Sequence, residues 1–346
     1  MRNDILKKFF VKENKKDTTK PTFNNYLFLN MKNEYLAYPQ IKLENIISKD
    51  VCTKIRPKDY LQSGFKQKED IIIPIKSQKT TNINKTHTHL SFNMIYCDVG
   101  HFIMGSNGDD SNPKTNKEIK KGFWLGEVEI TSSFFLSLLP NEPVGDNCSI
   151  NDPNKPIEAI MPHAMFRFCN ILSRLQGLNA CFFRDDEGQW FFDPNQNGYR
   201  LPFAFEWEYA AKAGTNNKYA GTNDKASLDQ YAIFSTHNSQ NQNSCDVATK
   251  LPNEWGFYDM IGNVWELCLE EDGFSKQKQK LSISLENRLL CAMGGAYFTK
   301  LMPSYIWSLE TNTLTTSTRY RESFDDNDCL NTRNKGVGFR IARTHY

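Results

Sequence analysis

Residues 251–270 read LPNEWGFYDMIGNVWELCLE, and this stretch decides the fold. Pro252-Asn253, Gly256 and Gly262-Asn263 place turns in it, because proline fixes φ while glycine and asparagine tolerate positive φ. Four large aromatic side chains interrupt these turns and carry too much apolar surface to stay in water: Trp255, Phe257, Tyr258 and Trp265. We therefore expect a loop pinned into a core, whose buried backbone carbonyls need partners; a bound cation is one way to supply them.

The stretch resembles the signature of the formylglycine-generating enzyme (sulfatase-modifying factor) family. Further blocks follow the family's own order: Phe102, Met104 and Gly105; the run YRLPFAFEWEYAA at 199–211; Gly294-Gly295; Arg319-Tyr320-Arg321; and Gly338-Phe339-Arg340. The resemblance covers about Ser91 to Arg343. It implies an α+β fold, the formylglycine-generating-enzyme-type variant of the C-type-lectin fold, with little regular secondary structure and an N-terminal extension.

Composition excludes several classes of protein. The chain has 346 residues, with Lys+Arg 42 against Asp+Glu 40, so its net charge of +2 argues against a nucleic-acid partner. No apolar run approaches the roughly 20 residues of a membrane helix, and the N-terminus is a poor secretory signal. The predicted location is therefore cytoplasmic, unless the chain leaves by a route that needs no such signal. The nine cysteines show no CxxC pattern, which favours buried or idle thiols over zinc ligands.

Three segments are predicted along the chain. Residues 1–25 are rich in Lys, Asn and Thr and are expected to be a disordered basic tail. Residues 26–90 form an accessory segment in which EDIIIPIKS reads as a strand, while His87 and His89 are too few for a metal site. Residues 91–346 form the domain that carries the resemblance.

Within that domain the patterns predict a strand at 122–130, a helix at 133–139 capped by Thr131 or Ser132, and a helix within 156–177 closed by Gly177. A hairpin is expected at 180–198 and a helix between Pro202 and Gly214. Glu206 and Glu208 lie two residues apart, so they point to different sides of that helix and cannot act as a catalytic pair. An ion pair between Glu206 and Arg200 is the expected role.

The resemblance also implies a metal site. Gly262, Asn263, Val264 and Glu266 match the family's second ion site, and a carboxylate with carbonyls from a tight loop suits structural Ca²⁺. The alternative is a turn held by hydrogen bonds alone. The family's other ion site, at Asp229 to Ser239 here, matches in part.

The family's oxidases bind copper(I) through two cysteines five residues apart, just before the Arg-Tyr-Arg block. Counting back from Arg319 places those positions at Asn312 and Ser317, and no cysteine stands between Cys291 and Cys329. Copper(I) prefers soft thiolates, so no copper is expected here. The family's iron-dependent branch needs a histidine spacing that the sequence lacks.

These observations predict a non-catalytic member that binds a protein or another ligand through its C-terminal region, 297–335. Aromatic and polar side chains mix in that region as they do in paratopes; the candidates are Tyr297, Phe298, Tyr305, Trp307, Asn312, Tyr320 and Asp325. One alternative is an oxidoreductase of the same family with an altered site, for which the candidates are Asn312, Ser317, Arg319, Tyr320 and Arg340. A structural or effector role centred on residues 1–90 is the other alternative.

Overall fold

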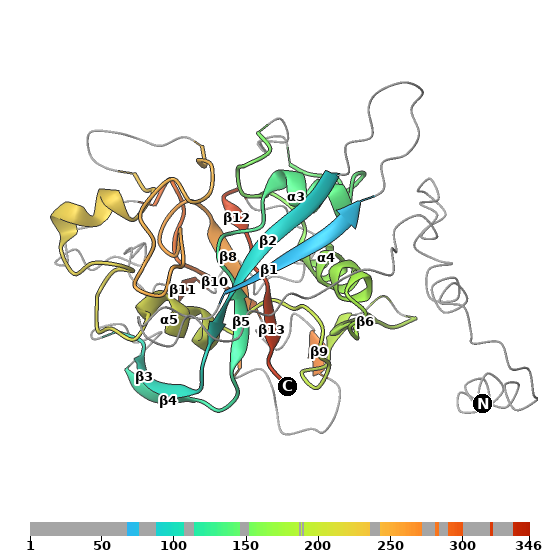
Figure 1. Cartoon of the computed structure of the whole chain (residues 1–346), viewed down its shortest axis with the longest axis horizontal. Coiled ribbons are helices and arrows are strands. Elements are labelled where there is room, and N and C mark those ends of the chain that lie inside the picture. The colour runs from blue at the N-terminus through green and yellow to red at the C-terminus, as the bar shows by residue number, and fades with distance from the viewer. Residues whose placement is uncertain are drawn as a thin grey trace, which may run out of the picture. The chain divides into compact units, whose positions relative to one another are not determined.

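Figure 1 shows the computed structural model of the chain. It describes residues 68–75, 88–106, 114–145, 152–186, 188, 190–235, 243–271, 281–283, 290–299, 319–320 and 335–346, all within the compact unit Ser48–Tyr346. The predicted tail 1–25 lies outside the described residues. The accessory segment contributes the expected strand, β1 (Lys68–Ile75), which pairs antiparallel with β2 (Thr88–Cys97) over eight residues.

The first sheet has the order β1-β2-β5-β13. Strand β5 (Phe123–Gly126) is shorter than the predicted strand at 122–130, because the chain turns after Gly126 and the next residues bond other partners. The last strand, β13 (Ala342–Thr344), pairs with β5, so the end of the chain closes the sheet that its first described strands began. Figure 1 shows this red strand beside the green β5.

The second sheet has the order β11-β10-β8-β12. Its strands are β8 (Trp265–Leu269), β10 (Leu290–Met293), β11 (Arg319–Tyr320) and β12 (Val337–Gly338). Strand β8 continues directly from the signature loop and is buried along its whole length. Its neighbour β12 runs parallel to it, which brings the Gly-Phe-Arg block against the signature.

The remaining described strands form two smaller sheets. The pair β3 (Gly100–Met104) and β4 (Thr115–Ile119) forms one of them. The other is β6 (Phe182–Arg184), β7 (Trp190–Phe192) and β9 (Leu281–Ile283), of which β6 and β7 are the predicted hairpin.

The helices are short, and those predicted at 133–139 and after Pro202 begin close to the expected residues. Helix α3 (Ser132–Leu138) is capped by the Thr131 side chain, α4 (Pro162–Leu175) is followed by Gly177 at φ 69°, and η3 (Lys225–Gln230) is a 3₁₀ turn. Helix α4 begins later than the expected Pro156, because Pro162 fits the first turn, Met161 before it is extended and Ala159 has a left-handed φ of 54°. None of the helices in the described part of the chain has the length and hydropathy needed to cross a membrane.

Helix α5 (Ala204–Lys212) carries the two acidic residues of the YRLPFAFEWEYAA block. Glu206 accepts two hydrogen bonds at 2.7 Å from the buried Arg200 guanidinium, which confirms the predicted ion pair. Glu208 instead accepts from the Gly105 amide and pairs with Lys212. The two carboxylates therefore serve separate structural contacts, as their spacing predicted.

The core divides over the two faces of β8. Trp265, Leu267 and Leu269 pack into a cluster with α3 and α4, whereas Cys268 packs with Trp207 of α5 in a second cluster. A strand that is buried on both faces has no solvent side, so its polar residue Glu266 must find partners inside the protein. This requirement sets up the central polar cluster.

Candidate functional site

The signature loop is held by its own side chains. Asn253 donates from Nδ2 to the Ala210 and Ala211 carbonyls at 2.8 and 3.2 Å, and its Oδ1 accepts the Trp255 and Phe257 amides at 3.1 Å. All four hydrogen-bonding positions of this buried amide are used, so it fastens the loop to the C-terminal end of α5. The loop is thus pinned into the core, as the sequence predicted.

The tightest point of the loop is Gly262-Asn263, with φ values of 80° and 55°. The Asn263 backbone N–H donates to the Ile233 carbonyl at 2.8 Å, and a Cβ on Gly262 would lie 2.0 Å from that same carbonyl oxygen. Glycine is therefore required here both by the left-handed backbone and by the close approach of another chain segment.

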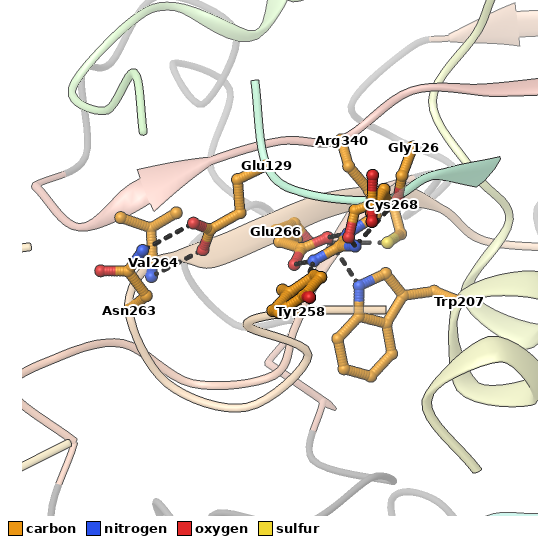
Figure 2. Close-up of polar contacts among 10 residues, drawn as sticks. Gly126, Glu129, Trp207, Tyr258, Asn263, Val264, Glu266, Cys268 and Arg340 are labelled. Atoms are coloured by element: carbon orange, nitrogen blue, oxygen red, sulfur yellow. Dashed lines mark hydrogen bonds and ion pairs between the residues drawn. The ribbon is translucent and has the colours of Figure 1, made fainter. Parts of the chain in front are cut away.

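Glu266 and Arg340 form the centre of the polar cluster (Figure 2). Arg340 donates from Nε and Nη2 to the two Glu266 oxygens at 2.5 and 2.6 Å, and Trp207 donates its indole N–H to Glu266 at 2.7 Å. The remaining guanidinium hydrogens reach the Gly126, Glu127 and Tyr258 carbonyls. Arg340 therefore ties both sheets to the signature loop while its own charge is neutralised.

A second buried carboxylate, Glu129, faces the turn. Its oxygens accept from Asn263 Nδ2 at 2.6 Å and from the Val264 amide at 3.2 Å, as Figure 2 shows beside the Glu266 cluster. Burial raises the pKa of Glu129 well above its usual range, and the Asp259 and Glu266 charges add to this effect. Sequence spacing could not have paired a residue at 129 with a turn at 263.

Two of the four predicted calcium ligands, Glu266 and Asn263, bind hydrogen-bond donors in the structure. Both Glu266 oxygens lie against a guanidinium, Asn263 Oδ1 accepts the Cys245 amide, and the Asn263 carbonyl accepts the Tyr297 amide. A cation that needs about six to eight oxygens would have to displace these donors and approach Arg340 directly. Within the described residues, no group of three or more His, Cys, Asp or Glu side chains is placed to hold a metal.

Removing or adding calcium is therefore expected to leave the thermal unfolding midpoint unchanged. An ion that binds the native state would raise the midpoint in proportion to its concentration over Kd. Differential scanning fluorimetry with chelator and with a calcium titration checks this. A midpoint that climbs steadily with calcium would contradict the assignment of these residues to hydrogen bonding.

The two ends of the C-terminal region meet where Gly336 approaches Phe298, beside a third buried carboxylate, Glu158. We call Glu158, Ser244, Tyr297, Phe298 and Gly336 the neck. Glu158 accepts from Ser244 Oγ at 2.8 Å and from the Gly336 amide at 2.7 Å. The Gly336 carbonyl in turn accepts the Trp265 amide of β8. Burial raises the pKa of Glu158, because desolvation outweighs the hydrogen bonds from Ser244 and Gly336.

The other side of the neck carries the two aromatic candidates that the structure describes in full. Tyr297 is 1% exposed and donates its amide to the Asn263 carbonyl, whereas Phe298 is 43% exposed and packs edge-on against the Tyr297 ring. A Cβ on Gly336 would lie 2.4 Å from the Phe298 ring, so the missing side chain there makes room for Phe298. The Tyr297 ring is part of the core, and its buried hydroxyl has no hydrogen-bond partner among the described residues.

The altered-site candidates are not gathered in one place by the described residues. Arg340 has no exposed surface and its guanidinium is paired with the Glu266 carboxylate, so it does not line an altered active site that a substrate could reach. Arg319 and Tyr320 form β11, opposite Met293 and Ala292 of β10. The other two altered-site candidates, Asn312 and Ser317, lie outside the described residues, as do the ligand-binding candidates Tyr305, Trp307 and Asp325.

One pair of cysteines stands out. Cys268 of β8 and Cys291 of β10 are directly opposite in the antiparallel register, and both are fully buried as thiols. Strand β11, with Arg319, pairs along the other side of β10. The family's pattern places the two cysteines five residues apart in the sequence, so it gave no sign that cysteines of two paired strands would lie opposite each other.

The short helices, small sheets and buried Glu–Arg centre define an α+β protein of the formylglycine-generating-enzyme type. Residues 79–345 match the family described as Sulfatase-modifying factor enzyme 1-like domain. The chain belongs to this family.

Individual relatives are distant. The chain is 28% identical over 178 residues to "Chaperone protein LppX" of Paenibacillus barcinonensis, a match that covers 43% of this chain and 62% of that relative's length. Among solved structures it is similar to Treponema denticola variable protein 1, with TM-score 0.57, 23% identity and coverage of 77% and 100% of the two chains. It is also similar to PvdO from Pseudomonas aeruginosa, with TM-score 0.51, 18% identity and coverage of 73% and 94%. At these identities the structures establish the fold.

Proposed function

We propose that this chain is a non-catalytic member of its family that binds a partner protein through its C-terminal region, 297–335. The observation that carries the proposal is the neck. At one end of the region Gly336 is bonded to Glu158, at the other Tyr297 is bonded to the Asn263 carbonyl, and Phe298 leaves this base with 43% of its surface exposed. Loops on a rigid scaffold are where proteins place binding residues, and an exposed aromatic side chain on a fixed base makes an effective anchor.

Two further observations support binding over catalysis. Counting back from Arg319 puts Asn312 and Ser317 at the positions of the family's thiols, and neither side chain is a copper(I) ligand. A relative that matches part of this chain is named a chaperone, which is a protein that acts on other proteins. A protein ligand is therefore the class that we favour over a small molecule.

A single substitution tests the anchor. Phe298→Ser is expected to weaken capture of the partner at least tenfold, about 1.4 kcal/mol, because aromatic anchors dominate interface energies. Its unfolding midpoint should fall only modestly, since 43% of the side chain is already exposed in the folded protein. The matched control is Phe183→Ser, which removes another exposed phenylalanine, 38% exposed, from strand β6.

The measurement is affinity capture from a lysate of the source cells with the full chain, followed by quantitative mass spectrometry. Proteins retained by the wild type and by Phe183→Ser but lost with Phe298→Ser are the candidate partners, and titration with a purified candidate then gives Kd. Equal retention by all three chains would remove the C-terminal anchor from the proposal.

The alternative is an oxidoreductase of the same family with an altered site, and one observation favours it. Cys268 and Cys291 place two thiols opposite each other one strand away from Arg319. Copper(I) titration and oxygen consumption with a cysteine-containing peptide separate the two functions. Turnover that disappears in Cys268→Ala would establish the enzyme and end the non-catalytic assignment.

A further inference from the structure

The two-stranded sheet of β3 and β4 has a solvent-exposed face that no contact described above uses. Its other face packs on the protein, where Phe102 meets the Tyr209 ring with centroids 5.3 Å apart and Ile119 is buried. On the exposed face, Ile103 of β3 and Val99 just before it leave 44% and 55% of their surface accessible. No further described strand pairs with either β3 or β4, and Figure 1 shows the pair at the rim of the labelled elements.

One edge of this sheet, that of β3, is occupied by helix α5. The Ile103 carbonyl accepts from Lys212, and the Gly105 amide donates to Glu208 at 2.7 Å. In an antiparallel pair, alternate residues turn both backbone groups toward the partner strand and the residues between them turn theirs away. The odd-numbered residues of β3 therefore face α5, and the even-numbered ones bond β4.

The opposite edge, that of β4, is open. Asn116 stands opposite Ile103, and Glu118 stands opposite His101. Because those two β3 residues turn away from β4, the backbone N–H and C=O groups of Asn116 and Glu118 also turn outward. None of these four groups bonds another described residue, and both residues are exposed. Such a row of unpaired groups is a template for another strand.

The charges along this edge select among strands. Lys114 and Lys120, at the two ends of β4, are exposed and form no ion pair with any described residue. Lys117 pairs with Glu271, and Glu118 lies 3.7 Å from the His101 ring nitrogen, so neither offsets the two free cations. Lysines on an edge keep neutral and basic strands away, but they attract a strand that carries carboxylates.

We propose that the outer edge of β4 binds an extended acidic segment of a partner protein, which adds to the sheet as a third strand. The outward backbone groups of Asn116 and Glu118 supply the main-chain hydrogen bonds, which give affinity in this mode of recognition. Carboxylates beside Lys114 and Lys120 supply the selectivity. No residue of 297–335 takes part, so this site does not rest on the proposed function.

The first test uses two blocked heptapeptides as probes, one of alternating Glu and Val and one of alternating Lys and Val. Fluorescence anisotropy measures the binding of each labelled peptide to the full chain. The Glu-Val peptide should bind at least about tenfold more tightly than the Lys-Val peptide, and its affinity should fall as salt is added. Equal affinity for the two peptides, or no binding of the Glu-Val peptide, would overturn the proposal.

Two substitutions at one residue then separate strand addition from simple charge attraction. Glu118→Pro removes the outward N–H, which edge strands tolerate, whereas the matched Glu118→Ala removes the same carboxylate and keeps the N–H. The Glu-Val peptide should bind Glu118→Pro at least about tenfold more weakly than Glu118→Ala. Lys120→Glu should also weaken binding, and Lys225→Glu, at an exposed lysine on η3, should not. Equal affinity of the two Glu118 variants would rule out strand addition.

If Glu118→Pro does not fold, amide hydrogen exchange of the wild type decides the matter. The Asn116 and Glu118 amides should exchange rapidly alone and at least about tenfold more slowly with the Glu-Val peptide, while the Lys117 amide, which faces β3, is protected in both cases. Outward amides that gain no protection in the presence of the peptide would contradict the site. None of these measurements involves the C-terminal region, so failure here leaves the proposed binding role standing.

Discussion

Replacing Arg340 with methionine is expected to cost about 3–5 kcal/mol of unfolding free energy, because it strands the Glu266 carboxylate in the core. Typical domains have only about 5–15 kcal/mol in total, so the variant should be largely unfolded or aggregated at physiological temperature. The loss should exceed that of an ordinary ion pair, since Arg340 has no exposed surface and also bonds the Gly126, Glu127 and Tyr258 carbonyls.

Equilibrium urea unfolding followed by tryptophan fluorescence measures this effect. Arg184→Met, at an exposed position, is the control and should change the unfolding free energy by less than about 1 kcal/mol. The double variant Arg340→Met/Glu266→Gln removes the stranded charge while its amide can still accept from Trp207, so it should recover part of the loss. A double variant as unstable as Arg340→Met would show that the lost carbonyl contacts, and not the charge, set the cost.

Gly262→Ala is the second large effect, expected to cost about 3–5 kcal/mol. The new Cβ would lie 2.0 Å from the Ile233 carbonyl oxygen, so the two backbone segments must separate, and the left-handed φ of 80° adds its own penalty. Because the clash is with backbone, no side-chain rotation can relieve it. The hydrogen bond from the Asn263 amide to Ile233 should weaken along with it.

Gly177→Ala isolates the conformational part of this cost. Gly177 has a similar φ of 69° but nothing within 4 Å of its added Cβ, so only the left-handed penalty of about 1–2 kcal/mol applies. Thermal and urea unfolding of both variants give the difference that belongs to the close approach. If the two substitutions cost the same, the Gly262–Ile233 approach is looser than described and the pinned-loop interpretation fails with it.

Local sequence patterns predicted most of the helices, the hairpin and one ion pair correctly. The Thr131 cap, the Gly177 helix end, the β6–β7 hairpin and the Arg200–Glu206 pair all depend on residues a few positions apart, and local sequence encodes such contacts directly. The ordered series of blocks also identified the family, because a family's motifs are themselves a record of one fold. The strand after Gly122 was predicted too long, since nothing local marks where a ladder loses its partner.

The candidate site was harder to predict. The resemblance implied that Glu266 is a calcium ligand, and Arg340 was a candidate of an altered active site. In the structure these two side chains form an ion pair with each other. It also brings Glu129, Asp259 and Glu158 into the core, none of which any spacing had suggested. A carboxylate looks the same in a sequence whether it faces water, a metal or a guanidinium, so its role depends on residues that arrive from elsewhere.

The sequence by itself determined the fold class and most of the local elements, because these depend on the order of motifs and on short-range contacts. Only the tertiary structure decided which buried carboxyls are paired with a cation and in which of them burial raises the pKa. The physical reason is that burial and electrostatic interaction depend on distance through space: Glu129 meets residue 263, Glu158 meets residue 336, and Asp259 lies near an arginine that already belongs to Glu266.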